Sequence, residues 1–280
     1  MNATRESAGS AAVGERAQRA NPLRRFLVRP ETGAVAGSAA VWIFFALVAG
    51  SSGFVTVRGT SSYLSVASEL AIQAIPVALL MIGGEFDLSV GSTVGACGMT
   101  IAILTTQYGL NVWLAIVAAL VLAVLIGMLN GYLVLRTNLP SFIVTLGTSY
   151  ILLGMTTGMT VVLTGLTVVN GVDQAPGFAS AHAIFATALG GGQQFPIEML
   201  WALALGAVAT WLLLRTRFGN WIFGVGGDKN AARNIGVPVA RVKISLFVGT
   251  ALCSCLLAII QIMTFTSADV LRGQGNEFYA

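Results

Sequence analysis

The segment from Gly83 to Ser92 holds the residues best suited to chemistry in this chain. It places two carboxylates, Glu85 and Asp87, among three glycines and between two long apolar segments. Ionisable side chains at membrane depth are costly unless they face protein or water, so they mark candidate functional sites. One interpretation makes Asp87 the N-cap of the following helix. In the other, a helix broken at Gly83-Gly84 lines a translocation path or its gate, because irregular backbone at that depth must lie beside protein or water. Both can hold together.

The composition requires that most of the chain face lipid. Of its 280 residues, 56% are hydrophobic and 9% are charged, whereas soluble domains carry roughly 25% charged residues. The net charge of +4 does not indicate nucleic-acid binding, since the basic residues are confined to particular loops. Neither the three cysteines nor His182 has the spacing of a metal site. No acid, base and nucleophile converge, so we expect no enzyme activity, no catalytic residues and no metal.

Seven apolar segments are long enough to cross a bilayer, which takes about 20 residues. We therefore expect an all-α, polytopic transmembrane helix bundle of about seven spans over residues 34–280, after a disordered tail at 1–33. With that tail in the cytoplasm, thirteen of the fifteen lysines and arginines fall on the inner side, as the positive-inside rule requires. Gly154 and Gly158 are spaced for close helix packing. The expected spans are 34–57, 63–83, 88–108, 111–135, 141–164, 197–214 and 244–264.

The inner loop 215–243 contains a short helix with clear start and stop signals. Asp228 is a good N-cap, and residues 229–235 read as about two helical turns after the flexible pair Gly226-Gly227. Gly236 is a natural helix end, and Pro238 prevents its continuation. A soluble partner could grip such a helix; the alternative is a solvated connector. The chain has no Walker A run, so these glycines do not bind a nucleotide phosphate.

Four motifs in the same order resemble the ribose-type sugar permeases of ABC importers, over roughly residues 60–275. The Ala231-Ala232 pair with Gly236 resembles their coupling-loop motif, with Asn230 in place of the usual glutamate. The opening segment resembles their Gly-Gly-x-Asp-Leu-Ser-x-Gly-Ser signature. The other two matching runs are 127–134 and 140–148, and the loop resemblance extends over 218–243.

The resemblance implies the permease subunit of an ATP-driven importer. Such a subunit moves a monosaccharide or related small polar solute across the bacterial inner membrane by alternating access. Its partners are a cytoplasmic ATPase that carries ATP and Mg, a periplasmic sugar-binding protein, and a second permease, as a homodimer or a heterodimer. This chain itself would bind no cofactor and no nucleic acid, and its N-terminus would be cytoplasmic. The residues implied are Asp228, Ala231, Ala232, Arg233 and Gly236 for coupling, and Gly84, Glu85, Asp87, Ser89 and Gly91 for the signature along the path.

Two departures from the family pattern stand out. Glu85 replaces a glycine of the signature, and we expect Glu85→Gly to be tolerated while Asp87→Asn impairs assembly or transport. Family members also continue past Ala280 to about ten spans. We expect this sequence to be a fragment rather than a real truncation; a truncated, inactive membrane scaffold is the alternative.

Further polar side chains lie within the expected spans. Glu69 and Gln73, four residues apart, share a helix face. Each polar side chain in the spans could bind a sugar hydroxyl in the pathway or bond a neighbouring helix instead. A different function class, a secondary transporter that works without an ATPase, would use Glu69, Glu85 and Asp87 as ion sites. The candidate pathway residues are Glu69, Gln73, Asn130, Thr145 and Thr148, and Gln261 has the same two interpretations.

Overall fold

A computed structural model describes residues 30–189 and 195–278. The predicted disorder of the tail concerns residues that lie almost wholly outside these ranges. The chain divides into two compact units, Met1–Gly59 and Thr60–Ala280. In the first, helix α2 (Pro30–Ala49) is followed by the 3-10 turn η1 (Gly50–Ser52). The side chains of α2 that are described are mostly exposed and apolar, as expected of a lipid-facing helix.

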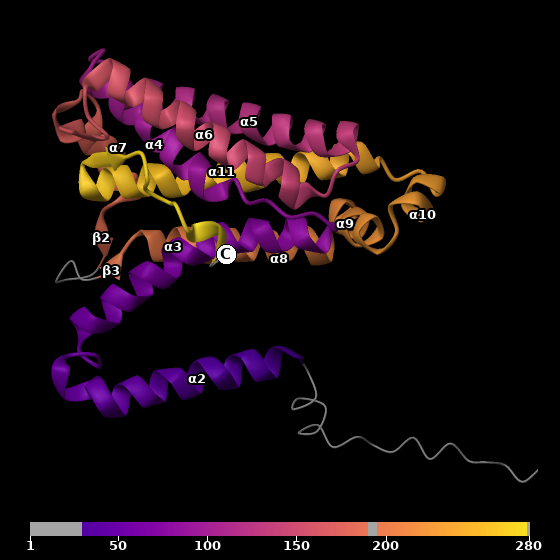
Figure 1. Cartoon of the computed structure of the whole chain (residues 1–280). Helices are drawn as coiled ribbons and strands as arrows, with labels where there is room; N and C mark the ends of the chain where they lie inside the picture. The colour runs from indigo at the N-terminus through magenta and orange to yellow at the C-terminus, as the bar shows by residue number, and fades with distance from the viewer. Residues whose placement is uncertain (1–29, 190–194, 279–280) are drawn as a thin grey trace, which may run out of the picture. The chain divides into compact units, whose positions relative to one another are not determined.

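The second unit is built of helices joined by short connections (Figure 1). Two small antiparallel ribbons accompany them: β1 (Val168–Asn170) pairs with β4 (Ser267–Asp269), and β2 (Ala188–Leu189) pairs with β3 (Phe195–Pro196). Three-residue 3-10 turns lie at Val172–Gln174 (η2) and Asn276–Phe278 (η3). The helices are α3 (Val57–Ile82), α4 (Val90–Thr106), α5 (Val112–Thr137), α6 (Ser141–Thr164), α7 (Phe178–Phe185), α8 (Glu198–Arg215), α9 (Arg217–Gly227), α10 (Lys229–Asn234) and α11 (Val239–Phe265).

Among the described residues, six helices are long and apolar enough to cross a membrane. They coincide with six of the seven predicted spans, and the all-α fold class is confirmed. The exception is the segment predicted at 88–108. Its helix, α4, has 17 residues and is about 25 Å long at 1.5 Å per residue. The residues before it, from Glu85 to Ser89, are not helical.

The core of the second unit forms around α4. This helix is buried along nearly its whole length and lies beside α5, α6 and α11 (Figure 1). Glycines of the 127–134 motif bring α5 against α11: a Cβ on Gly127 would lie 2.6 Å from the Cα of Val248, and one on Gly131 would lie 2.9 Å from that of Ile244. Small residues at such points let two helix backbones approach closely. A Cβ added at Gly154 or Gly158 would meet no described atom within 4 Å, so this pair does not pack against another described helix.

The predicted inner loops gather at one end of this unit. Helices α9 and α10 lie at the end opposite to α7 (Figure 1). The predicted loop 215–243 is largely helical, and α11 begins at Val239 rather than at residue 244. Lys243 therefore lies inside the first turns of a spanning helix and is buried there.

Candidate functional site

The signature segment, residues 83–92, leaves α3 in a turn and continues as irregular, non-helical backbone until α4 begins at Val90. Glu85 contacts Lys243, and Asp87, two residues on, contacts Thr250. These two partners are seven residues apart on α11, or about 10 Å along the helix axis. The segment therefore lies along α11 before α4 begins. Helix α4, with 17 residues, is a shorter apolar helix among the described residues.

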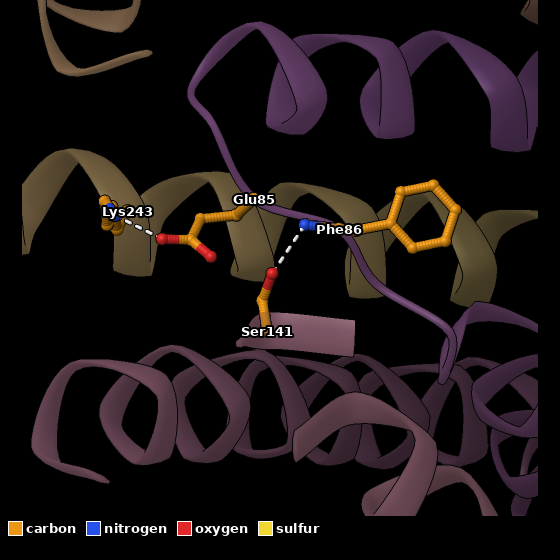
Figure 2. Close-up of polar contacts among 4 residues, drawn as sticks. All are labelled: Glu85, Phe86, Ser141 and Lys243. Atoms are coloured by element: carbon orange, nitrogen blue, oxygen red, sulfur yellow. Dashed lines mark hydrogen bonds and ion pairs between the residues drawn. The ribbon is translucent and has the colours of Figure 1, made fainter. Parts of the chain in front are cut away.

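Hydroxyl groups of α6 bind the exposed backbone of this segment. The amide of Phe86 donates to Ser141 Oγ at 2.9 Å, and the amide of Leu88 donates to Thr145 Oγ1 at 3.0 Å. Figure 2 shows the first of these bonds, with the Phe86 ring pointing away from Lys243. Unpaired backbone amides at membrane depth are strongly unfavourable. Ser141 and Thr145 thus allow a non-helical segment to lie there.

Asp87 is the centre of a buried hydrogen-bond network. Its side chain is 2% exposed. One carboxylate oxygen accepts from the Ser89 amide at 2.8 Å and the Ser89 hydroxyl at 2.6 Å, and the other accepts from Thr250 Oγ1 at 3.0 Å. Asn130 Nδ2 donates to Ser89 Oγ at 2.8 Å. The network joins the segment to α5 and α11 at the same time.

The prediction that Asp87 is the N-cap of α4 is wrong. The helix begins at Val90, the capping position belongs to Ser89, and no side chain caps it. The Asp87 carboxylate instead accepts from the amide two residues ahead, the local turn that aspartate favours. Thr93 Oγ1 donates to the Ser89 carbonyl at 2.8 Å.

Glu85 and Lys243 form a buried ion pair near the start of the segment (Figure 2). Their side chains are 10% and 8% exposed, respectively. A lysine buried in a helix bundle needs a charged partner. The carboxylate that departs from the family signature supplies that partner here.

Gly226 places α9 directly against the start of the signature segment. A Cβ on Gly226 would lie 1.8 Å from the carbonyl oxygen of Ile82, and its Cα lies 3.5 Å from the Cβ position of Gly84, whose φ is +80°. The prediction that Gly226-Gly227 is a flexible pair ahead of the short helix is wrong, because both residues belong to α9. Gly226 is a point of close backbone contact between the inner loop and the signature.

Helix α10 begins and ends where the sequence predicts a capped helix. Asp228 accepts hydrogen bonds from the amides of Ala231 and Asn230, at 3.1 and 2.7 Å. These bonds hold the pKa of the Asp228 carboxyl below its usual range. The helix ends at Asn234, and Gly236 follows with φ at +87°, the left-handed conformation of a helix stop.

The coupling residues lie on different faces of α10. Ala232 is 3% exposed and packs in the apolar cluster formed with α9 and α11. Ala231 and Arg233 are exposed. Ile235, just after the helix, is 81% exposed. An exposed large apolar side chain beside an exposed alanine offers a contact surface.

Most predicted pathway residues bond to neighbouring structure. Asn130 and Thr145 hold the signature segment, as described above. Glu69 accepts from Gln261 Nε2 at 2.7 Å, which links α3 to α11. Gln73 Nε2 reaches the Val90 carbonyl at 3.5 Å, and Thr148 Oγ1 donates to Val144 of its own helix at 3.0 Å. Gly91 is buried in α4, where its carbonyl faces Gly273.

The site also uses residues that sequence reasoning did not select. Lys243, Ser141 and Thr250 make direct contacts with the segment. Lys243 could have been selected from the sequence, because it lies at the beginning of an apolar span, where a buried charge needs a partner. A hydroxyl within an apolar run is too common to have indicated Thr250.

Comparisons with known proteins show the family of the chain. A family described as "Branched-chain amino acid transport system / permease component" matches residues 59–280. The autoinducer 2 import system permease protein LsrD of Klebsiella pneumoniae is 32% identical over 200 residues, which cover 71% of this chain and 58% of the relative. The same-named protein of Photorhabdus luminescens has the same identity and coverage, and that of Salmonella typhimurium is 30% identical over the same coverage.

The chain thus spans about 58% of the length of the curated relatives it matches. No solved structure matches it. The family match, by contrast, covers the whole second unit, and its members are permease components rather than enzymes. With its multiple membrane-crossing helices and this match, the chain belongs to the family of branched-chain amino acid transport system permease components.

Proposed function

We propose that this chain is the membrane-spanning permease of an ATP-driven importer for a monosaccharide or related small polar solute. It would work by alternating access in the inner membrane of a bacterium, with its N-terminus in the cytoplasm. The ATPase, with its ATP and Mg, would be a separate cytoplasmic subunit. A periplasmic binding protein would deliver the solute, and a second permease would complete the pathway.

The observation that carries this proposal is the continuous connection from α10 to the signature segment. Helix α10 packs through Ala232 against α9 and α11. Helix α9 in turn meets the end of α3 at Gly226, and α11 meets Glu85 at Lys243. A push on α10 would reach the signature segment by two routes, a close backbone contact at Gly226 and the buried ion pair at Lys243. A packed structure of this kind transmits displacement rather than absorbing it.

The outward face of α10 supports an ATPase as the partner. Ala231 and Ile235 are four residues apart, so their side chains share one face, and both are exposed. Two exposed apolar side chains on a short helix with defined ends suit docking into a groove of a soluble subunit. The face of α6 with Gly154 and Gly158, which no described residue covers, suits close approach of a second permease.

The substrate class rests on the relatives and on the family resemblance of the motifs. The relatives are named as permeases for autoinducer 2 import. Among the described residues, the side-chain carbonyl oxygens of Gln73, Asn130 and Gln261 are buried without a hydrogen-bond partner. Such acceptors suit brief contact with the hydroxyl groups of a polar solute, and we expect the binding protein to supply the selectivity.

Reconstituted uptake tests the proposal. The protein is placed in liposomes with a candidate ATPase and a candidate binding protein, and uptake of labelled sugars is followed with and without ATP. Uptake only with ATP supports the proposal. Uptake driven by an ion gradient without the ATPase would instead establish a secondary transporter.

Coupling is tested in the same liposomes with Gly236→Val. A β-branched residue at positive φ is strongly strained, so the end of α10 should be displaced and both uptake and stimulated ATP hydrolysis should fall. Gly227→Val is the matched control, because a Cβ at either glycine meets no described atom within 4 Å and only Gly236 has positive φ. Normal uptake by Gly236→Val would contradict the coupling role.

A further inference from the structure

A polar cavity of about 280 Å³ lies between the end of α5, helix α10 and the start of α11. Its polar wall comes from three basic side chains, two asparagines and one carboxylate, and its remaining wall is apolar. None of the residues on this wall other than Glu85 belongs to the signature segment. The lining residues are Glu85, Val134, Leu135, Asn138, Leu139, Lys229, Asn230, Arg233, Val239 and Lys243.

The charges around this cavity do not balance. Lys243 is neutralised by Glu85, the one carboxylate of the lining. Over residues 30–189 and 195–278, that pair is the only ion pair within 4 Å that the structure contains. Lys229 and Arg233 therefore face the cavity as two cations without a carboxylate partner. They are one helical turn apart on the same face of α10, so each raises the unfavourable positive potential at the other.

The cavity face of α10 is distinct from its outward face. Lys229 and Arg233 are each two residues from Ala231 and Ile235, respectively. Two residues correspond to about 200° of rotation around a helix. A partner on the Ala231 and Ile235 face would thus leave the basic face open to a second ligand.

We propose that this cavity binds a phosphate group, carried by an anionic phospholipid headgroup or by a soluble phosphate. Arg233 offers a planar set of donors that suits phosphate oxygens, and Lys229 adds a point charge. The amides of Asn138 and Asn230 are further donors on the same wall. One phosphate supplies the negative charge that the two unpaired cations lack.

The position of the cavity is well suited to a lipid headgroup. It opens where two membrane-crossing helices, α5 and α11, meet α10. Leu135 and Leu139 lie on its wall, and Leu139 is 49% exposed. Basic pockets of this kind, at the ends of transmembrane helices and bordered by apolar surface, bind anionic headgroups. The inference does not depend on the proposed transport function.

Thermal melting of the purified chain in a neutral detergent tests the inference. In one arm, phosphatidylglycerol is titrated into the micelles, with phosphatidylcholine as the neutral comparison. In the other arm, inorganic phosphate is added at constant ionic strength. A ligand that binds the folded state raises the melting temperature in a concentration-dependent manner, which yields an apparent affinity for each arm.

The variants are Lys229→Gln with Arg233→Gln and, as the matched control, Arg136→Gln with Arg241→Gln. The control removes the same charge from exposed residues that do not line the cavity. At about 1 kcal/mol for each basic residue, the cavity variant should bind the anion about thirtyfold more weakly, whereas the control should stay within about twofold of wild type. Melting without ligand shows that both variants fold.

Each outcome decides the matter. A response to phosphatidylglycerol alone that the cavity variant loses establishes a lipid site, and a response to inorganic phosphate lost in the same way establishes a soluble phosphate site. An equal loss in both double variants would show only general charge attraction and would overturn the inference. So would the absence of any stabilisation of the wild-type chain.

Discussion

The carboxylate of Glu85 and the ammonium group of Lys243 form an ion pair between residues 158 positions apart in the chain. The pair is buried, and it ties the signature segment to the first turns of α11. A charged side chain that is buried away from water is strongly unfavourable unless it is paired with an opposite charge. The residue that departs from the family signature is therefore part of the local structure and has a defined partner.

Replacement of Glu85 by glycine should destabilise the protein. The signature pattern alone favours tolerance of this change, but the structure would leave Lys243 buried without a partner. Loss of one member of a buried pair costs about 3–5 kcal/mol. The melting temperature of the purified chain measures the effect.

The matched control for this change is the double variant Glu85→Gln with Lys243→Gln. It removes both charges, so it should be clearly more stable than Glu85→Gln alone. The two single variants and the double variant together form a double-mutant cycle, which gives the interaction energy between the two side chains. If Glu85→Gly melted with the wild-type protein, the ion pair would contribute nothing and the expectation from the signature would stand.

Asp87→Asn should lower stability although the side chain keeps its shape. The two Asp87 oxygens accept three hydrogen bonds, and asparagine would keep the two bonds from Ser89 only as bonds between neutral groups. Hydrogen bonds to a charged group contribute about 1.5–3 kcal/mol and those between neutral groups about 0.5–1.5 kcal/mol, so the loss should be about 1–2 kcal/mol. Asp173→Asn is the control, since Asp173 is exposed. Equal melting temperatures for the two variants would argue against the network.

Gly226→Ala and Gly227→Ala should behave differently although the residues are neighbours in α9. A Cβ at Gly226 would lie 1.8 Å from the Ile82 carbonyl oxygen, whereas one at Gly227 meets no described atom within 4 Å. The first change must push α9 away from α3, while the second removes a helix glycine and should be neutral or slightly stabilising. Melting temperature and uptake should both fall for Gly226→Ala alone. Wild-type behaviour of Gly226→Ala would exclude a tight contact.

Protonation of Asp228 should loosen the start of α10, but only in acid. The amides of Ala231 and Asn230 lower the pKa of this carboxyl in the folded protein. Its contribution is therefore fully present above the unfolded pKa and is lost as the pH falls through the lower, folded pKa. The protection of these two amides against hydrogen exchange, taken relative to the intrinsic exchange rate at each pH, should persist at neutral pH. It should fall only below about pH 4. Asp228→Asn, which keeps an acceptor without titrating, should remove the pH dependence.

Several features follow from the local sequence, because their causes are local. Continuous apolar runs of about 20 residues favour membrane-crossing helices, and six of the seven predicted spans coincide with described helices that are long and apolar enough to cross a membrane. The limits of α10 follow from Asp228 and Gly236, which act within one helical turn. The sequence also indicated a break in the helix at Gly83-Gly84, where α3 ends.

Tertiary structure decided how that segment is held. The roles of Lys243, Ser141 and Thr250 depend on α6 and α11 folding against it, and no spacing along the chain reveals such contacts. Gly226 was expected to be flexible because glycine has few backbone restrictions. In the structure it lies in α9, against the carbonyl oxygen of Ile82, where there is no room for a larger residue. Asp87 looked like an N-cap because local signals alone suggested one, whereas its carboxylate is taken up by Ser89 and Thr250. Apolar periodicity and capping are properties of neighbouring residues, but partners for a buried charge or backbone amide come from wherever the fold brings a donor within about 3 Å.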